Sequence, residues 1–112
     1  MTAQTAADQI NAAGAAMALL TRHSGLPAPT LDLALMYSPE DDREVWGLRL
    51  GIHWGLSGFE KWRQALDIDP DTIADRTSGQ LYTLRAETRF AGVRVELTGF
   101  HTLPDDDTST EQ

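Results

Sequence analysis

Three histidines, His23, His53 and His101, are the residues of this sequence best suited to acid–base chemistry or metal binding. An imidazole acts as a catalytic base or zinc ligand only where it meets a carboxylate, a hydroxyl or another imidazole. The spacing brings no two of them together, although His53 and His101 both fall at expected strand ends. We interpret them as partly exposed histidines without special chemistry. A small enzyme that uses His53 or His101 is our third hypothesis.

The segment 67–71, Asp-Ile-Asp-Pro-Asp, places carboxylates at alternate positions, as calcium-binding loops do. The loop departs from the calcium pattern, because Thr72 stands where glycine is required and Ser78 where a bidentate glutamate is required. We therefore predict no metal site and no cofactor, and interpret the segment as a solvated acidic loop that ends a helix.

Acidic residues dominate the charge of the chain, which is −8 at pH 7. This charge opposes attraction to phosphate backbones and anionic membranes, so nucleic acid is a disfavoured partner and a membrane is excluded. A protein with this charge can instead mimic nucleic acid and occupy a basic DNA- or RNA-binding protein, which is our alternative hypothesis. The carboxylates of that mimic would be Glu40, Asp41, Asp42, Glu44, Asp67, Asp69, Asp71 and Asp75.

The length of 112 residues, of which 41% are hydrophobic, fits a single folded domain. We expect a flexible N-terminus over residues 1–5, one α+β domain over 6–103, and a disordered acidic tail over 104–112. The chain lacks cysteine, which excludes disulfides and a cysteine nucleophile. No apolar run approaches 18 residues and no signal segment is evident, so we expect a cytoplasmic protein.

Two helices are predicted from apolar periodicity and capping residues. The first covers Ala6 to His23 and ends before Gly25. A capping box formed by Ser57 and Glu60 begins the second, which ends near residue 66 or 67. The side chains expected to face the core are Ala6, Ile10, Ala13, Met17 and Leu20 in the first helix, and Phe59, Trp62 and Leu66 in the second.

Four strands are predicted from strict alternation of apolar residues. The segment 45–54 is the most apolar and reads as a central strand, preceded by a strand over residues 31–37. We predict a register in which Tyr37 faces Trp46 and Leu31 faces Ile52. Its large inward residues are Leu31, Leu33, Leu35 and Tyr37 in one strand and Trp46, Leu48, Leu50, Ile52 and Trp54 in the other.

The last hairpin allows two registers that keep its apolar faces together. A four-residue loop over 89–92 sets Glu87 opposite Arg94, whereas a two-residue loop over 91–92 sets Glu87 opposite Glu96. A like-charge pair costs up to about 1 kcal/mol relative to an opposite pair, so we predict the longer loop.

The resulting architecture is a two-layer αββαββ sandwich, with a four-stranded antiparallel sheet and both helices on one face. Residues 69–79 are expected to form a loop with one helical turn, anchored by Ile73. The open face of the sheet would carry arginines beside an aromatic residue, as single-stranded RNA platforms do, but carboxylates match the arginines.

Our leading hypothesis is a non-enzymatic protein–protein interaction or regulatory module. It would bind a protein partner, or a second copy in a homodimer, through the open sheet face or a sheet edge. Gly47 and Gly51 would leave gaps on the face for a partner. The candidate binding residues are Gly47, Arg49, Gly51, His53, Arg85, Arg94 and Phe100.

Overall fold

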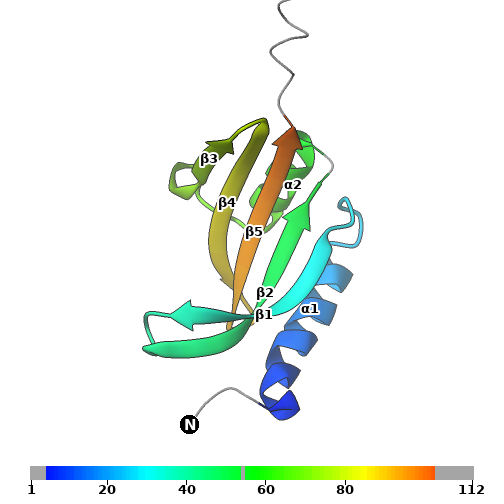
Figure 1. The fold of residues 1–112 in the computed structure, drawn as a ribbon. Helices are drawn as coiled ribbons and strands as arrows, with labels where there is room; N and C mark the ends of the chain where they lie inside the picture. The colour runs from blue at the N-terminus through cyan, green and yellow to red at the C-terminus, as the bar shows by residue number, and fades with distance from the viewer. Residues whose placement is uncertain (1–4, 54, 103–112) are drawn as a thin grey trace, which may run out of the picture.

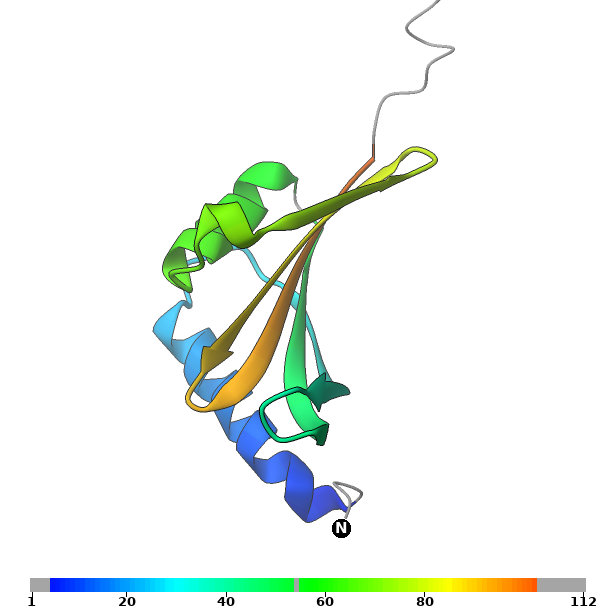
Figure 2. The same cartoon turned by 90° about the vertical axis from the view of Figure 1, so that its left-hand side faces the viewer.

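The computed structural model describes residues 5–53 and 55–102, which form a five-stranded sheet in the order β1-β2-β5-β4-β3. Two α-helices lie on one face of this sheet and leave the other face uncovered (Figures 1 and 2). The elements are η1 (Ala6–Gln9), α1 (Ile10–Arg22), β1 (Thr30–Ser38), β2 (Arg43–Ile52), α2 (Leu56–Ala65), η2 (Pro70–Thr72), β3 (Ala74–Ser78), β4 (Leu81–Phe90) and β5 (Val93–Thr102).

The α+β class is confirmed, but the prediction of four antiparallel strands is wrong in two respects. A fifth strand, β3, pairs with β4, and the central strands β2 and β5 run parallel. The parallel pairing joins the two most apolar strands at the centre of the sheet, where Leu48, Leu50 and Leu97 are completely buried. The predicted flexible N-terminus and acidic tail fall almost wholly on residues 1–4 and 103–112, outside the described residues.

Strand β3 was missed because its sequence, Ala-Asp-Arg-Thr-Ser, has neither alternation nor strong β propensity. All five of its residues are exposed, and it pairs on one side with β4. The helical turn expected in this region is present as η2, whose N-cap Asp69 accepts a hydrogen bond from the backbone N–H of Asp71. Ile73 packs against the core as predicted.

The register of the first hairpin differs by two residues from the prediction. Leu31 pairs with Leu50 and Leu35 with Trp46, so the inward faces are those predicted but the loop is two residues shorter. A two-residue shift keeps every side chain on its face, which is why apolar alternation could not detect it. Tyr37 is exposed at the end of the hairpin, where its hydroxyl donates to Asp42.

The second hairpin adopts the register that the charge argument rejected. Ala91 and Gly92 form the two-residue loop with φ angles of 54° and 80°, and Glu87 pairs with Glu96. Positive φ at both loop residues gives the primed turn whose twist matches that of the strands. The charges are compatible with this register because opposite charges meet diagonally, Arg94 with Glu87 and Arg85 with Glu96.

Helix α2 packs against β5 and contributes its aromatic side chains to the core. Phe59 and Trp62 are buried as predicted, and the Trp62 indole N–H donates a 2.8 Å hydrogen bond to the carbonyl of Pro27 in the α1–β1 connection. The predicted capping box does not form, because the helix begins at Leu56 after Gly55, which has a φ of 90°. Trp54, also expected in the core, lies outside the described residues.

Helix α1 faces the sheet with a different side from the one predicted. Its buried residues are Ala12, Ala15, Ala16 and Leu19, whereas the stripe predicted to be buried is exposed throughout. Three alanines let the helix approach the sheet closely, and the larger apolar side chains are left outside. Neither described α-helix is long and apolar enough to cross a membrane.

Candidate protein interaction surfaces

A carboxylate on β5, that of Glu96, lies at the centre of the open sheet face. Arg49 of β2 and Arg85 of β4 place their Nε atoms 2.8 and 3.1 Å from its two oxygens. The Glu96 side chain is only 12% exposed, while both arginine side chains are at least half exposed. The predicted face is therefore assembled, but its arginines already bind a carboxylate of this chain, which weakens any resemblance to an RNA platform.

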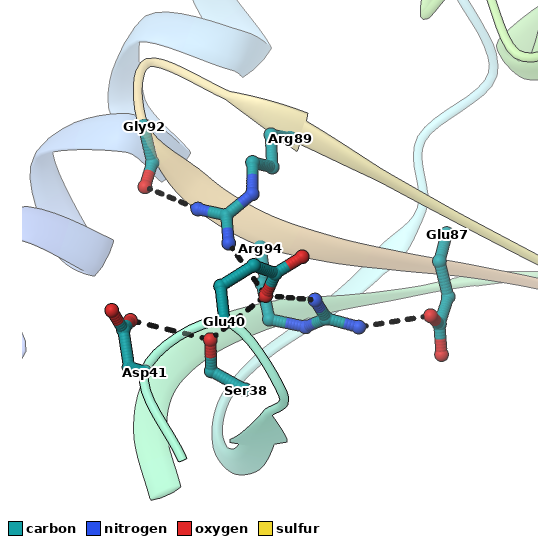
Figure 3. Close-up of polar contacts among 7 residues, drawn as sticks. All are labelled: Ser38, Glu40, Asp41, Glu87, Arg89, Gly92 and Arg94. Carbon is teal, nitrogen blue, oxygen red and sulfur yellow. Dashed lines mark hydrogen bonds and ion pairs between the residues drawn. The ribbon is translucent and has the colours of Figure 1, made fainter. Parts of the chain in front are cut away.

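A second polar network joins the tips of the two hairpins (Figure 3). The guanidinium group of Arg94 lies 2.9 Å from a carboxylate oxygen of Glu87 and 3.5 Å from one of Glu40. It therefore links the open face to the β1–β2 loop. Arg89 contacts the same Glu40 oxygen at 3.1 Å, and the fully buried Ser38 hydroxyl donates to it at 3.1 Å. The network fixes the β1–β2 loop against the β4–β5 hairpin.

The pKa of Glu40 is held below the ordinary glutamate value by this network. Its carboxylate accepts hydrogen bonds from its own backbone N–H and from Ser38, and Arg89 adds a nearby positive charge. A carboxyl group whose pKa is lower in the folded than in the unfolded state stabilises the fold above the unfolded pKa. That contribution is lost as the pH falls through the folded pKa.

Replacing Glu40 by glutamine should therefore lower the midpoint of urea unfolding at pH 7, and the difference from wild type should shrink as the pH falls through the folded pKa of Glu40. Glu44→Gln is the matched control, since among the described residues the Glu44 side chain makes no hydrogen bond or ion pair. Equal midpoints for wild type and Glu40→Gln at pH 7 would show that the network does not stabilise the fold.

The two glycines of the open face do not leave gaps for a partner. A Cβ at Gly47 would lie 2.8 Å from the Met36 sulfur, and one at Gly51 would lie 2.5 Å from the Thr30 hydroxyl. The His53 ring stacks on Phe100, with ring centroids 4.8 Å apart. Side chains of this chain thus fill the space that the sequence suggested was open.

The three histidines remain apart in the structure. His53 lies on the open face with its Nε2 atom 3.3 Å from the Thr30 hydroxyl, whereas His101 is exposed opposite Tyr82 at the end of β5. The His23 ring packs against the Trp62 ring in a T-shaped arrangement, with ring centroids 5.7 Å apart. Among residues 5–53 and 55–102, no carboxylate hydrogen-bonds to an imidazole, and no three metal-binding side chains cluster.

The acidic residues form two groups rather than one array. Those of the β1–β2 loop lie at one end of the sheet, and those around η2 and β3 lie toward the other (Figure 1). Several already accept hydrogen bonds: Asp42 from Tyr37 and Asp75 from Tyr82, which raises the pKa of each tyrosine. Glu44, Asp67 and Asp71 are exposed.

The two sheet edges differ in length and chemistry. The edge strand β1 has nine residues, of which Asp32 alone is charged, and its leucines are half-buried. Within the described chain it pairs with β2 only, so one side of its backbone has no strand partner. Edge strand β3 has five exposed residues, with Asp75 and Arg76 adjacent. Short, charged edges resist strand pairing, whereas long apolar edges favour it.

Besides the β1 edge, a second exposed surface is the outer stripe of α1, formed by Ile10, Ala13, Met17 and Leu20. Periodicity identified these residues as one apolar face but not as the exposed one. Nothing in the alternation of β1 distinguished an edge from an interior strand, because strand order depends on the rest of the sheet.

No family model matches this chain, and no match was found among curated proteins or among solved structures.

Proposed function

We propose that this protein is a non-enzymatic interaction module that binds another polypeptide by adding a strand to the β1 edge. The observation that carries the proposal is the β1 edge itself, nine residues long and nearly free of charge. An added strand would supply backbone hydrogen bonds along this edge and pack its side chains on half-buried leucines. Strand addition would remove little water from charged groups, because β1 carries only one carboxylate.

The open sheet face supports this proposal less directly. Glu96 and Arg94 form ion pairs within the chain. A partner on this face would have to break these ion pairs or bind at the side chains around them. Partner contacts around Arg49 and Arg85 remain compatible with edge binding, since both guanidinium groups are solvent-exposed. The open face is therefore the second candidate surface for a partner.

Photo-crosslinking tests the proposal directly. A photoreactive residue is placed at Asp32, on the open-face side of the edge strand β1, at Glu87 on β4, further across the same face, or at Thr77 in β3, all of which are exposed. We expect a crosslinked protein of defined mass from position 32 in extracts of the native host, and none from position 77. A product from position 87 alone would move the binding site to the open face, and a product from position 77 alone would contradict the proposal.

The acidic-mimic and enzyme hypotheses each predict a result that strand addition does not. An acidic mimic that uses the eight carboxylates named in the sequence would lose its basic partner steeply as salt rises, whereas a complex formed by strand addition would not. An enzyme that uses His53 or His101 would lose activity when both are replaced by alanine. A partner complex that survives high salt, and a function that survives the double replacement, would remove these alternatives.

A further inference from the structure

We infer that the strand added at the β1 edge belongs to a second copy of this chain, and that the exposed stripe of α1 completes the same interface. This inference rests on the proposed function, because it uses the β1 edge. It identifies the partner and adds a helical surface that the edge alone does not require.

The outer stripe of α1 is unusually apolar for a surface helix. Ile10 is 66% exposed, Met17 71% and Leu20 40%, and Ala13 lies between them on the same side. The helix carries no charged residue from Ile10 to Thr21, although 23% of the chain is charged. A helix exposed to water normally carries charged residues on its outer face, so this stripe indicates a surface that is covered in the assembled protein.

The stripe lies on the same side of the molecule as the β1 edge. Ala7 and Asn11 line a hollow of about 360 Å³ together with residues of both hairpins, among them Trp46 and Val93, so that flank of the helical segment faces the hairpin tips. Leu20 follows Asn11 by nine residues, and at about 100° per residue it lies on the opposite flank. Helix α1 contacts β1, and Figure 1 shows it beneath the β1 side of the sheet.

A two-fold axis makes these surfaces complementary to their own copies. Antiparallel pairing of β1 with the β1 of a second copy satisfies the free backbone groups on both sides. The same rotation keeps all helices on one face of a continuous sheet and brings the α1 stripes of the two copies toward each other. No other described surface combines a free strand edge with an apolar helix in this way.

The size of the surface fits a specific dimer. Strand β1 is about 30 Å long and α1 about 20 Å, since a strand rises about 3.4 Å per residue and a helix 1.5 Å. At a width of about 12 Å, the diameter of a helix with its side chains, the two elements offer roughly 600 Å² per copy, near the lower end of specific interfaces. Each copy carries a net charge of −8, so raising the salt should strengthen this dimer by screening repulsion between the copies.

Sedimentation equilibrium across a range of protein concentrations at low and high salt tests the inference. We expect a monomer–dimer equilibrium that shifts toward dimer at high salt. Met17→Glu should raise the dimer dissociation constant at least about tenfold, because it buries a charge between two copies. Ala18→Glu is the matched control, since Ala18 is exposed on the other flank of α1. It should leave the dissociation constant within about twofold of wild type.

Hydrogen exchange identifies the strand involved. Alternate amides of β1, those directed away from β2, should exchange more slowly at high protein concentration, while the exposed edge of β3 stays unchanged. A chain that is monomeric at all concentrations, or a dimer without added β1 protection, would overturn the inference. A dimer equally sensitive to Met17→Glu and Ala18→Glu would do so too. If the chain is monomeric and a different protein crosslinks at position 32, the second copy is excluded while the proposed function stands.

Discussion

Replacing Trp62 by alanine should lower the free energy of unfolding by about 3–5 kcal/mol, the range found for large aromatic residues removed from cores. The side chain is 1% exposed beneath the sheet, so its removal leaves a cavity that the helix cannot readily fill. Its indole N–H also donates to the Pro27 carbonyl at 2.8 Å and connects α2 to the segment between α1 and β1. Urea denaturation followed by circular dichroism measures the loss.

Two variants separate packing from hydrogen bonding at this position. Trp62→Phe keeps most of the apolar volume and removes the donor, so it should cost less than the alanine variant, the lost hydrogen bond contributing about 1 kcal/mol. Lys61→Ala, at an exposed position of the same helix, should change stability by less than about 0.5 kcal/mol. If Trp62→Ala unfolds within 1 kcal/mol of wild type, Trp62 does not hold α2 on the sheet.

Adding one methyl group at Gly99 should destabilise the protein by about 1–3 kcal/mol, as overpacking does in well-filled cores. A Cβ at this position would lie 2.6 Å from the Cδ1 atom of Phe59, too close for any real contact. Gly99 therefore allows the Phe59 ring to lie directly on the backbone of β5. Thermal or urea unfolding of Gly99→Ala gives the magnitude.

A second substitution tests the cause of that loss. Phe59→Leu alone should be destabilising, but combined with Gly99→Ala it should cost less than the sum of the two single changes, because the smaller side chain relieves the clash. Gly25→Ala is the control, since a Cβ there meets nothing within 4 Å. Strict additivity of the two changes would show that the ring does not require the glycine.

The sequence was sufficient for the features that depend on alternation. The inward faces of Leu31, Leu33, Leu48 and Leu50 and the buried side of α2 follow from periodicity, and the structure confirms them. Both hairpin registers were wrong by two residues, because a shift of two preserves every face. The helix α1 presented two apolar stripes, and only the close approach allowed by alanine selects the buried one.

The candidate site was predictable only as a set of residues on one face. Arg49, Arg85 and Arg94 do share the open face, but their diagonal partners depend on the register. The β1 edge could not be predicted, since it follows from strand order. That order places β5 between β2 and β4, a pairing between segments nearly fifty residues apart that no local pattern encodes.

The parallel pairing of β2 with β5 also sets the order in which the fold can be completed. The two hairpins β1–β2 and β4–β5 are formed by neighbouring segments, so each can form early and independently. Their joining requires the chain to close a long loop through α2 and β3 before Leu50 meets Leu97. Until β5 emerges from the ribosome, β2 exposes an apolar edge of its own. The nascent chain therefore passes through a stage in which both sides of the β1–β2 hairpin are open to strand pairing, and a delay at that stage would favour aggregation over folding.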